Sequence, residues 1–494
     1  MIRLINLLWL LPLFTLIRPA IGQEKMPIDP NIKMGKLDNG LVYYIRKNAK
    51  PEKRVELRLA VNAGSILETD DQQGLAHFCE HMCFNGTKNF PHAELVNTIE
   101  RMGIKFGADL NAYTSFDETV YMLKVPTDQT DLIDKGFQIL EDWAHQVTLD
   151  GKEIDKERGV ILEEWRLGLG ADDRMRKKSF PVIFKDSKYA ERIPIGKPEI
   201  LKTFKHETLR QFYKDWYRPN LQAVIVVGDI DVDQMEQKIK QHFSGIQNPV
   251  NERKREIFDL PDNKEPLVSI ETDEEATSNT VMFFYKHPKK YIETIEDFKF
   301  QLMQDLFTGM INNRLEEIGQ KPDCPYIYAG TQYGEFLART KDSYLGYAVS
   351  KENQIEKSLE TVMTENQRVK QFGFTATEFE RQKTELLKRY EKQAKEFDKM
   401  ESGNLAMEYV YHFLAKNPIP GAVKEFEFAK QFLPEIKLEE VNALSKQWIT
   451  DNNLVVMITA PKKDGIKVPT KDDVLKIIDK VKSLQLTAYE DKQT

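Results

Sequence analysis

The sequence predicts an α+β protein of two homologous domains, each with a mainly antiparallel sheet and helices packed on one face. Three observations predict this fold. Strand-like and helix-like apolar patterns alternate along the chain, its 494 residues exceed one ordinary domain, and its two halves repeat the same landmarks. Hydrophobic residues make up 41% of the chain, enough for real cores, and a net charge of −7 gives no sign of nucleic-acid binding.

Residues 1–22 have the pattern of a secretory signal peptide. Arg3 precedes an almost wholly apolar run at residues 4–17, and small residues near Gly22 offer a cleavage site. The run is too short to span a bilayer comfortably, and no later segment is apolar enough to do so. We therefore expect an exported protein, most simply a periplasmic one.

The first domain is expected at residues 26–245. Residues 35–44 predict a hairpin closed by a tight turn at Asn39-Gly40. The other expected elements are strands at residues 54–62, 119–125 and 223–227 and helices at residues 93–102, 131–146, 152–167 and 208–216, besides a helix that carries residues 77–82. The stretch before residue 208, rich in Lys, Pro and Gly, is expected to be irregular.

Residues 246–266 are expected to be an interdomain linker, because this segment is polar, charged and interrupted by proline. A second α+β domain is expected at residues 267–485. Trp216 precedes a run of valines, and Trp448 likewise precedes the strand-like VVMIT. The segment EIDKE (residues 153–157) resembles EFERQ (residues 378–382). The sequence distance between the two members is nearly the same in both pairs. Two landmarks at nearly equal offsets indicate an internal duplication more than a generic helix-then-strand likeness.

The most informative segment is HFCEH, which begins at His77 and ends at His81. On a helix the two histidines lie one turn apart on one face, where two imidazoles can bind one zinc ion. Glu80 is placed to act as general base on a water held by that metal, in the inverse of the commoner HExxH order. A chance match or a surface histidine pair is the alternative. The apolar flanks and the Asn85-Gly86 helix stop favour a buried helix whose polar groups need a partner.

A catalytic zinc usually has three protein ligands and one open position. The helix IDKERGVILEEWR places Glu157 and Glu164 two turns apart on one face with Val160 and Ile161, so this face is expected to be buried. Glu163 is rotated by about 100° from Glu164. Glu164 is therefore the predicted third ligand. Glu157 is predicted to orient a histidine or the metal water, and a plain salt bridge is its alternative role.

The second half cannot hold zinc in the same way. Its equivalent positions are Gln382 and Arg389, and its helix near residues 300–314 contains no histidine. One zinc ion per chain is therefore expected. Cys79 and Cys83 lie four apart on the motif helix, an awkward geometry for a disulfide, so they are expected to be buried thiols.

Together these motifs resemble the M16 (pitrilysin/insulinase) metallopeptidase family, in particular the zinc-bearing N-terminal half of its PqqL-like bacterial branch. The likeness covers nearly all of the mature chain. It rests on HFCEH, on NGT at residues 85–87, on LNAYTS at residues 110–115 and on the helix with Glu157 and Glu164, although the gap before Glu164 is longer than usual. The resemblance implies domains of the LuxS/MPP-like fold.

The resemblance also implies roles for individual residues. It implies that His77, His81 and Glu164 bind zinc, that Glu80 activates water and that a carboxylate at position 157 supports the site. It further implies that Asn111 and Ala112 lie on a strand edge that pairs with the backbone of a peptide substrate.

One family feature is out of place. Family members complete the site with an arginine and, seven residues later, a tyrosine, carried by a domain that faces the zinc. Tyr326 is the candidate tyrosine and substrate contact, but Gly319 stands seven positions before it and Arg314 is out of register. We therefore expect the pair to come from a second M16 half: a separate subunit, a homodimer mate or a C-terminal half absent from this chain.

The sequence thus predicts a zinc-dependent endopeptidase or oligopeptidase that hydrolyses extended or unfolded peptides. Two other classes stay open. One is a structural subunit with an inactive peptidase fold, and the other is a periplasmic zinc-binding or uptake-accessory protein that holds zinc without cleaving peptides.

Overall fold

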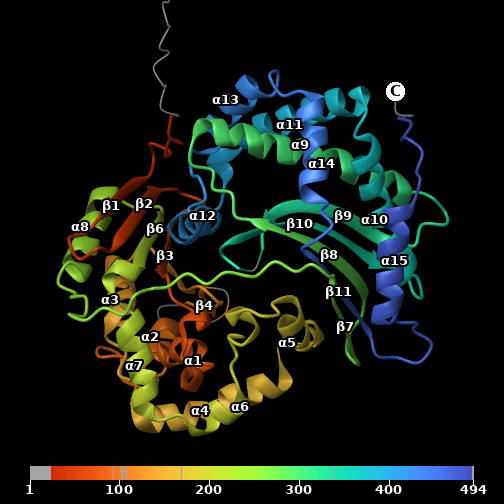
Figure 1. Cartoon of the computed structure of the whole chain (residues 1–494). Coiled ribbons are helices and arrows are strands. Elements are labelled where there is room, and N and C mark those ends of the chain that lie inside the picture. Colours follow the sequence, from red (N-terminus) through yellow and green to blue (C-terminus); the bar gives the residue numbers. More distant parts are fainter. Residues whose placement is uncertain are drawn as a thin grey trace, which may run out of the picture.

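The structure, a computed structural model, describes residues 24–92, 94–101, 104–105, 107, 109–168, 170–336 and 338–491. The predicted signal peptide lies outside these residues. Two mixed regions of sheet and helix, one from each half of the chain, lie side by side (Figure 1). The predicted α+β fold of two similar domains is therefore confirmed.

The first sheet contains six strands in the order β1-β2-β6-β3-β5-β4. The strands are β1 (Lys33–Lys36), β2 (Val42–Lys47), β3 (Arg54–Val61), β4 (Leu110–Thr114), β5 (Thr119–Pro126) and β6 (Gln222–Gly228). Neighbouring strands are antiparallel except β2 and β6. The expected hairpin turn joins β1 to β2, and Gly40 adopts a φ of 94° there, which glycine tolerates without strain. The last strand, β4, is an edge of the sheet.

The expected helices of the first half are present within a few residues of their predicted bounds. The helices are α1 (Leu75–Met82), α2 (Glu94–Arg101), α3 (Thr130–His145), α4 (Gly151–Leu167), α5 (Ala171–Ile183), α6 (Pro198–Thr203), α7 (His206–Trp216) and α8 (Val232–Phe243). One expectation was wrong: the segment predicted to be irregular contains α5 and α6, and α8 was not among the expected helices. Pro181 lies in the last turn of α5 and removes one helical hydrogen bond there, and packing against the other half stabilises this helix.

The second sheet repeats the first. Its strands are β7 (Leu267–Asp273), β8 (Asn279–Pro288), β9 (Tyr326–Glu335), β10 (Lys341–Ser350) and β11 (Leu454–Pro461). Their order β7-β11-β8-β10-β9 matches β2-β6-β3-β5-β4 strand for strand, again with one parallel pair at the same place. Trp216 ends α7 before β6, as Trp448 ends the equivalent helix before β11. The topology therefore supports the predicted duplication.

Among the described residues of the second half, seven helices have eight or more residues: α9 (Ile295–Gly319), α10 (Ile355–Phe372), α11 (Ala376–Lys395), α12 (Ser402–Ala415), α13 (Ala422–Phe432), α14 (Leu438–Trp448) and α15 (Lys471–Ser483). Residues 246–266, the expected linker, form neither helix nor strand and cross from the first half to β7 (Figure 1). The domain boundaries drawn there stay a prediction.

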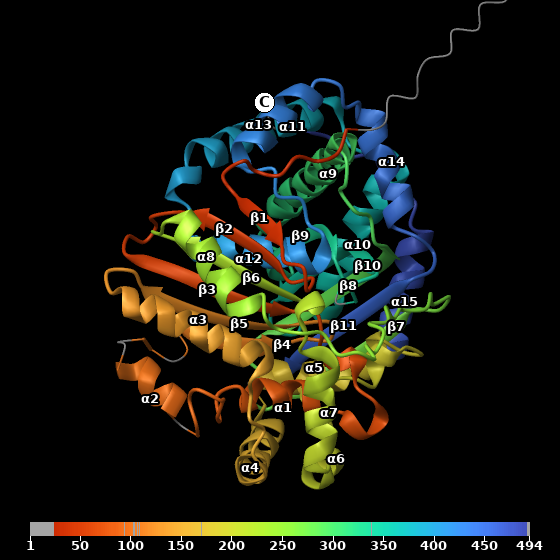
Figure 2. The ribbon, with the colours of Figure 1, turned by 90° about the vertical axis from the view of Figure 1, so that its left-hand side faces the viewer.

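Each sheet also receives one helix from the other half of the chain. Leu57 and Leu59 of β3 point into the first core with the helices of their own half, whereas Ala60 points to the opposite face. There Leu405 and Tyr409 of α12 cover the sheet, and Figure 2 shows α12 beside β6. Helix α12 of the second half therefore packs on the sheet of the first half.

The reciprocal contact is made by α5, which packs against β7 of the second sheet. Ser269 donates a hydrogen bond to Ser179 over 3.0 Å, and Arg174 donates two hydrogen bonds to Asp273 over 2.6 and 2.8 Å. Because α5 also lines the cavity described below, the second half supports one wall of that cavity.

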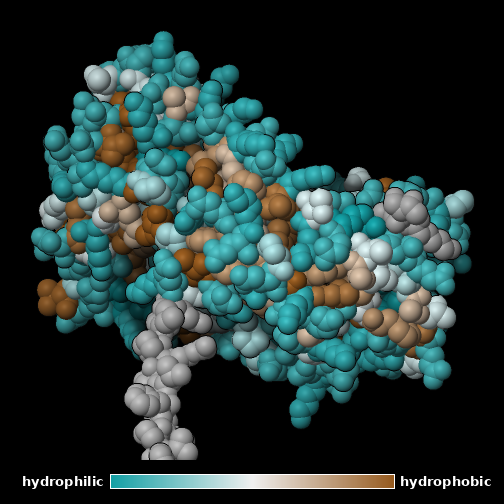
Figure 3. Space-filling view, turned by 90° about the horizontal axis from the view of Figure 1, so that it is seen from above, coloured by the Kyte–Doolittle hydropathy of each residue, from teal (hydrophilic) through white to brown (hydrophobic). Residues whose placement is uncertain are grey.

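Hydrophilic side chains dominate the upper face of the molecule, and hydrophobic side chains gather between them in smaller patches (Figure 3). Among the described helices, none is both long and apolar enough to cross a membrane. All three cysteines are buried and free, as expected for thiols that take no part in disulfides.

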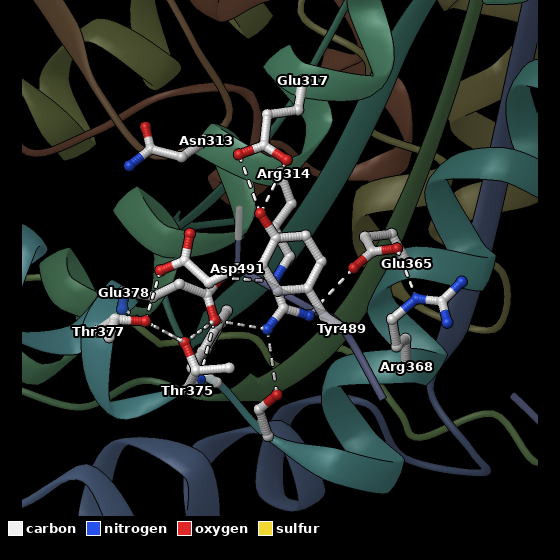
Figure 4. A network of polar contacts seen from close by, with 12 residues as sticks. Asn313, Arg314, Glu317, Glu365, Arg368, Thr375, Thr377, Glu378, Tyr489 and Asp491 are labelled. Atoms are coloured by element: carbon white, nitrogen blue, oxygen red, sulfur yellow. Dashed lines mark hydrogen bonds and ion pairs between the residues drawn. The ribbon is translucent and has the colours of Figure 1, made fainter. Parts of the chain in front are cut away.

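The segment after α15 folds back over a buried cation (Figure 4). Arg314 of α9 is 2% exposed and donates hydrogen bonds to Glu378 over 2.6 and 2.8 Å and to Glu365 over 3.1 Å. The ring of Tyr489 lies 4.1 Å from its guanidinium group, and the Tyr489 hydroxyl donates to Glu317 over 2.7 Å. Arg314 is therefore a core residue of the second half.

We expect the variant Tyr489→Ala to lower the free energy of unfolding by about 2 kcal/mol, since it loses a cation–π contact and a hydrogen bond to a carboxylate. Chemical denaturation measures this change. Tyr489→Phe keeps the ring over Arg314 and should recover the larger part of the loss. Equal losses in both variants would contradict a role for the ring.

A cavity of about 400 Å³ lies between α12 and the ends of β8 and β9, and Glu408 lines it. Burial raises the pKa of Glu408 to about 7. In the unfolded chain, Glu408 loses its proton near the ordinary glutamate pKa of about 4.5, whereas in the folded state it keeps the proton up to a pH of about 7. The free energy of unfolding therefore falls as the pH rises through this range.

We expect Glu408→Gln to raise the free energy of unfolding at pH 8 by roughly 2 kcal/mol, allowing for partial solvent screening, and to change it little at pH 4.5. Thermal or chemical unfolding at the two pH values checks this. Glu401→Gln, at an exposed carboxyl just before the same helix, is the matched control. An equal effect at both pH values would contradict the assignment.

Candidate metal site

The two histidines of the motif are held by the short helix α1. Its apolar side chains, Leu75, Phe78 and Met82 among them, are fully buried in the first core. This burial turns the opposite face of the helix toward a cavity, and the Nε2 atoms of His77 and His81 lie 3.2 Å apart on that face. The predicted one-turn spacing thus brings both imidazoles to one point.

The third predicted ligand reaches the same point from α4. Carboxylate oxygens of Glu164 lie 3.8 Å from His77 Nε2 and 3.4 Å from His81 Nε2. Zinc bonds of about 2.0–2.1 Å in a tetrahedron place ligand atoms about 3.3 Å apart. Two of the separations, 3.2 and 3.4 Å, match this spacing, and the third, from His77 to the other Glu164 oxygen, is longer at 3.8 Å. Among the described residues, this is also the one group of three such side chains that could hold a metal ion.

Glu157 fixes the orientation of one imidazole. His81 Nδ1 donates to Glu157 Oε1 over 2.8 Å, and Asn85 Nδ2 donates to Glu157 Oε2 over 2.8 Å. Because the proton of His81 is held at Nδ1, its Nε2 lone pair faces His77 and Glu164. The contact is the one expected of a supporting carboxylate, and it is also an ion-pair contact, so the role of Glu157 stays a prediction.

Burial and neighbouring charges shift the pKa values of the two histidines in opposite directions. Burial lowers the pKa of His77 to about 4, and the charge of His81 adds to the shift. Burial also opposes protonation of His81, but its contacts with Glu157 and Glu164 prevail and raise its pKa to about 9. With this raised pKa, His81 carries a second proton at Nε2 near neutral pH when no metal is bound, and a dication at this position would replace that proton.

Glu80 lies beside the ligands with 8% of its surface exposed. Thr114 of β4 donates to Glu80 Oε2 over 2.6 Å. Burial raises the pKa of Glu80 to about 6, and the Thr114 hydrogen bond opposes the shift. Sequence reasoning missed Thr114, although the two-residue period of a strand places it on the same side as Ala112.

These residues open into a cavity of about 890 Å³. Apolar side chains form much of its wall, and a basic pair on α5 lies at one side; these residues are Phe84, Val96, Val160, Phe180, Ile195, Arg176 and Lys177. The expected burial of the α4 face was half wrong. Ile161 is fully buried, but Val160 is 51% exposed because this face meets the cavity and not the core.

The predicted substrate strand borders the same cavity. Asn111 and Ala112 lie on β4 and line the cavity beside α1. The backbone N–H of Ala112 donates to the side-chain oxygen of Asn111 over 2.9 Å. Among the described residues, β4 pairs with β5 on one side only, so its other edge offers backbone groups to an extended peptide, although the Ala112 N–H is engaged by Asn111.

Tyr326 does not reach this site. It is 3% exposed within the second core, and its hydroxyl donates to the backbone oxygen of Leu315 over 2.6 Å. The positions equivalent to the zinc site hold other pairs: Gln382 accepts a hydrogen bond from Asn313, and Arg389 binds Asp305 over 2.6 Å. In the second half, an amide hydrogen bond and an ion pair thus occupy the positions equivalent to Glu157 and Glu164.

Comparison with known proteins agrees with this geometry. Residues 43–167 match the family model described as Insulinase (Peptidase family M16), and residues 203–386 match the model described as Peptidase M16 inactive domain. The first segment contains His77, His81 and Glu164. The first model lies within the first half of the chain, whereas the second model begins at the end of α6 in the first half and ends within α11 of the second half.

Individual proteins show the same likeness. The chain is 31% identical over 466 residues to a "Zinc protease PQQL-like" of Arabidopsis thaliana, covering 94% of this chain and 45% of that protein. It is 32% identical over 450 residues to the "Probable zinc protease PqqL" of Escherichia coli strain K12, covering 90% of this chain and 47% of that protein. The chain thus spans about half the length of these curated relatives.

A solved structure extends the likeness to three dimensions. The first half of the periplasmic protease PqqL from Escherichia coli superposes with a TM-score of 0.86 at 27% identity, covering 94% of this chain and 100% of that one. The structure described as the crystal structure of the periplasmic protease PqqL from Escherichia coli gives a TM-score of 0.87, and the match covers 52% of that chain.

Proposed function

This chain belongs to peptidase family M16, and from that premise we propose that it is the zinc-bearing half of a zinc-dependent endopeptidase or oligopeptidase. One observation carries the proposal. Ligand atoms of His77, His81 and Glu164 stand close to tetrahedral spacing beside the buried carboxylate of Glu80, within one cavity.

Each residue has a distinct role in this proposal. His77, His81 and Glu164 would hold the zinc ion, which when bound supplies a Lewis acid that polarises a carbonyl and acidifies water. Glu80 takes the proton of the attacking water and passes it to the leaving amine. Thr114 holds Glu80 in place, and the carboxylate at position 157 fixes His81.

The substrate is proposed to be an extended or unfolded peptide. Its backbone would add to the free edge of β4 at Asn111 and Ala112, which gives affinity with little dependence on sequence. The apolar cavity wall would receive side chains next to the cleaved bond. Such binding needs a peptide whose backbone is extended and accessible, so it would favour peptides without tertiary structure.

A second half is proposed to complete the working site. The chain spans about half of its curated relatives, and Tyr326 and Arg314 are both engaged in the core of the second domain. The arginine and tyrosine expected of the family would then come from a separate subunit, a second copy or a following segment. Export to the periplasm is proposed from the N-terminal sequence and from the relative described as a periplasmic protease.

The experiment that tests the function measures metal content and peptide cleavage together. The mature chain would be assayed on a mixture of unstructured peptides, with and without a chelator, alone and with a candidate second half. We expect one zinc per chain and chelator-sensitive cleavage inside the peptides. Zinc without cleavage in every combination would favour a zinc-binding accessory protein, and a chain that binds no zinc would favour a structural subunit.

A further inference from the structure

A buried glutamate, Glu68, lies at the start of the helix that carries the zinc motif. Glu68 is 0% exposed, and it is not one of the residues that line the cavity. Its Oε1 accepts a hydrogen bond from the backbone N–H of Ala76 over 2.8 Å, and its Oε2 accepts one from Gly74 over 3.1 Å. Both oxygens therefore bind N–H groups that a helix start leaves without a partner.

No local side chain performs this capping. Gly74 is the N-cap residue of α1 and has no side chain to accept a hydrogen bond, and its φ of 100° is one that glycine adopts without strain. The capping acceptor comes instead from six positions upstream. Glu68 thus links α1 to a separate segment of the chain.

That segment is itself firmly held. The backbone oxygen of Glu68 accepts from Arg192 Nε over 3.1 Å, and the backbone oxygen of Arg192 accepts from the Ser65 hydroxyl over 2.6 Å. These two hydrogen bonds leave Glu68 little freedom to follow α1 if the helix shifts. The start of α1 also touches the segment after Arg192, since a Cβ atom on Gly196 would lie only 2.3 Å from the Cα atom of Gly74.

The position of α1 matters because it carries both histidines. The helix has only eight residues, and His77 directly follows Ala76, one of the two residues that Glu68 binds. Glu164 comes from another helix, α4. A displacement of α1 along its axis would therefore change the spacing of both histidines to Glu164 at once.

We propose that Glu68 is a positioning residue that sets the placement of α1, and through it the spacing between the histidine pair and Glu164. The inference rests on the proposed metal site. Glu68 contacts neither the ligand atoms nor the cavity, so it acts through the backbone of α1. Its loss should alter how zinc is bound and not merely how stable the protein is.

The test compares Glu68→Ala with Glu68→Gln in the mature chain. Alanine removes both acceptors, whereas glutamine keeps one carbonyl oxygen. We expect the alanine variant to bind zinc about 10- to 100-fold more weakly, in the range found for groups that orient metal ligands, and the glutamine variant to lie between it and the wild type. The visible absorption of bound Co²⁺ should shift in the same order.

The control is Asp71→Asn, an exposed carboxylate three positions away that accepts from the Thr69 hydroxyl. It should leave the zinc affinity and the Co²⁺ spectrum unchanged. Where the complete enzyme is active, kcat should fall in the Glu68 variants while KM stays constant.

The outcomes separate this inference from the proposed function. Variants with wild-type zinc affinity and Co²⁺ spectrum, but a lower unfolding temperature, would overturn the positioning role and leave the metal site intact. If Glu68→Ala does not fold, the zinc affinity and Co²⁺ spectrum of Glu68→Gln decide between the same two outcomes. A wild-type chain that binds no zinc would overturn both.

Discussion

Glu80→Gln is expected to abolish peptide turnover while zinc stays bound. Glutamine keeps the size of the side chain and can still meet the Thr114 hydroxyl, but it cannot accept the proton of an attacking water. A positioned general base contributes about 10²- to 10⁴-fold to a rate, so the variant should lose at least about 10²-fold in kcat. The three proposed ligands are untouched by the change.

The measurement pairs peptide cleavage with metal content for the same preparation. Glu163→Gln is the matched control, because Glu163 is an exposed carboxylate on α4 that binds Arg166 over 2.6 Å and faces away from the cavity. It should keep both zinc and activity. Full activity in Glu80→Gln would remove Glu80 from the role of base, and loss of zinc would make it a ligand instead.

The features that the sequence could predict depend on local spacing. The one-turn separation of His77 and His81 and the two-turn separation of Glu157 and Glu164 are fixed by helix geometry, and the structure brings these four side chains together. The duplication could also be predicted, because the landmark at Trp216 and its counterpart in the second half keep the same position in each copy.

The features that could not be predicted depend on contacts between distant segments. Helix α5 has weak local signals and a proline, and packing on β7 stabilises it. Likewise α12 covers a sheet that lies far upstream in the sequence. Thr114 reaches Glu80 only because β4 runs beside α1, and Tyr326 has no sequence signal that separates a buried tyrosine from a substrate contact. In each case tertiary packing decides the outcome.

Glu164→Gln is expected to cost the site most of its affinity for zinc. Glu164 supplies the one anionic ligand in the group, and its side chain is 25% exposed at the cavity, close to both histidines. The contacts with His81 and His77 lower the pKa of Glu164 despite its partial burial, so it is a carboxylate at neutral pH. An amide offers a neutral oxygen, which is a much weaker ligand for a dication.

Loss of an outer partner of a ligand typically costs 10- to 100-fold in metal affinity, so loss of the ligand itself should cost at least about 100-fold. Competition with a chromophoric chelator measures this change, and Glu163→Gln on the same helix again serves as control. Cleavage should fall in proportion to the zinc lost and return in part at high zinc concentration, which distinguishes this variant from Glu80→Gln. Wild-type zinc affinity in Glu164→Gln would mean that the third ligand lies elsewhere.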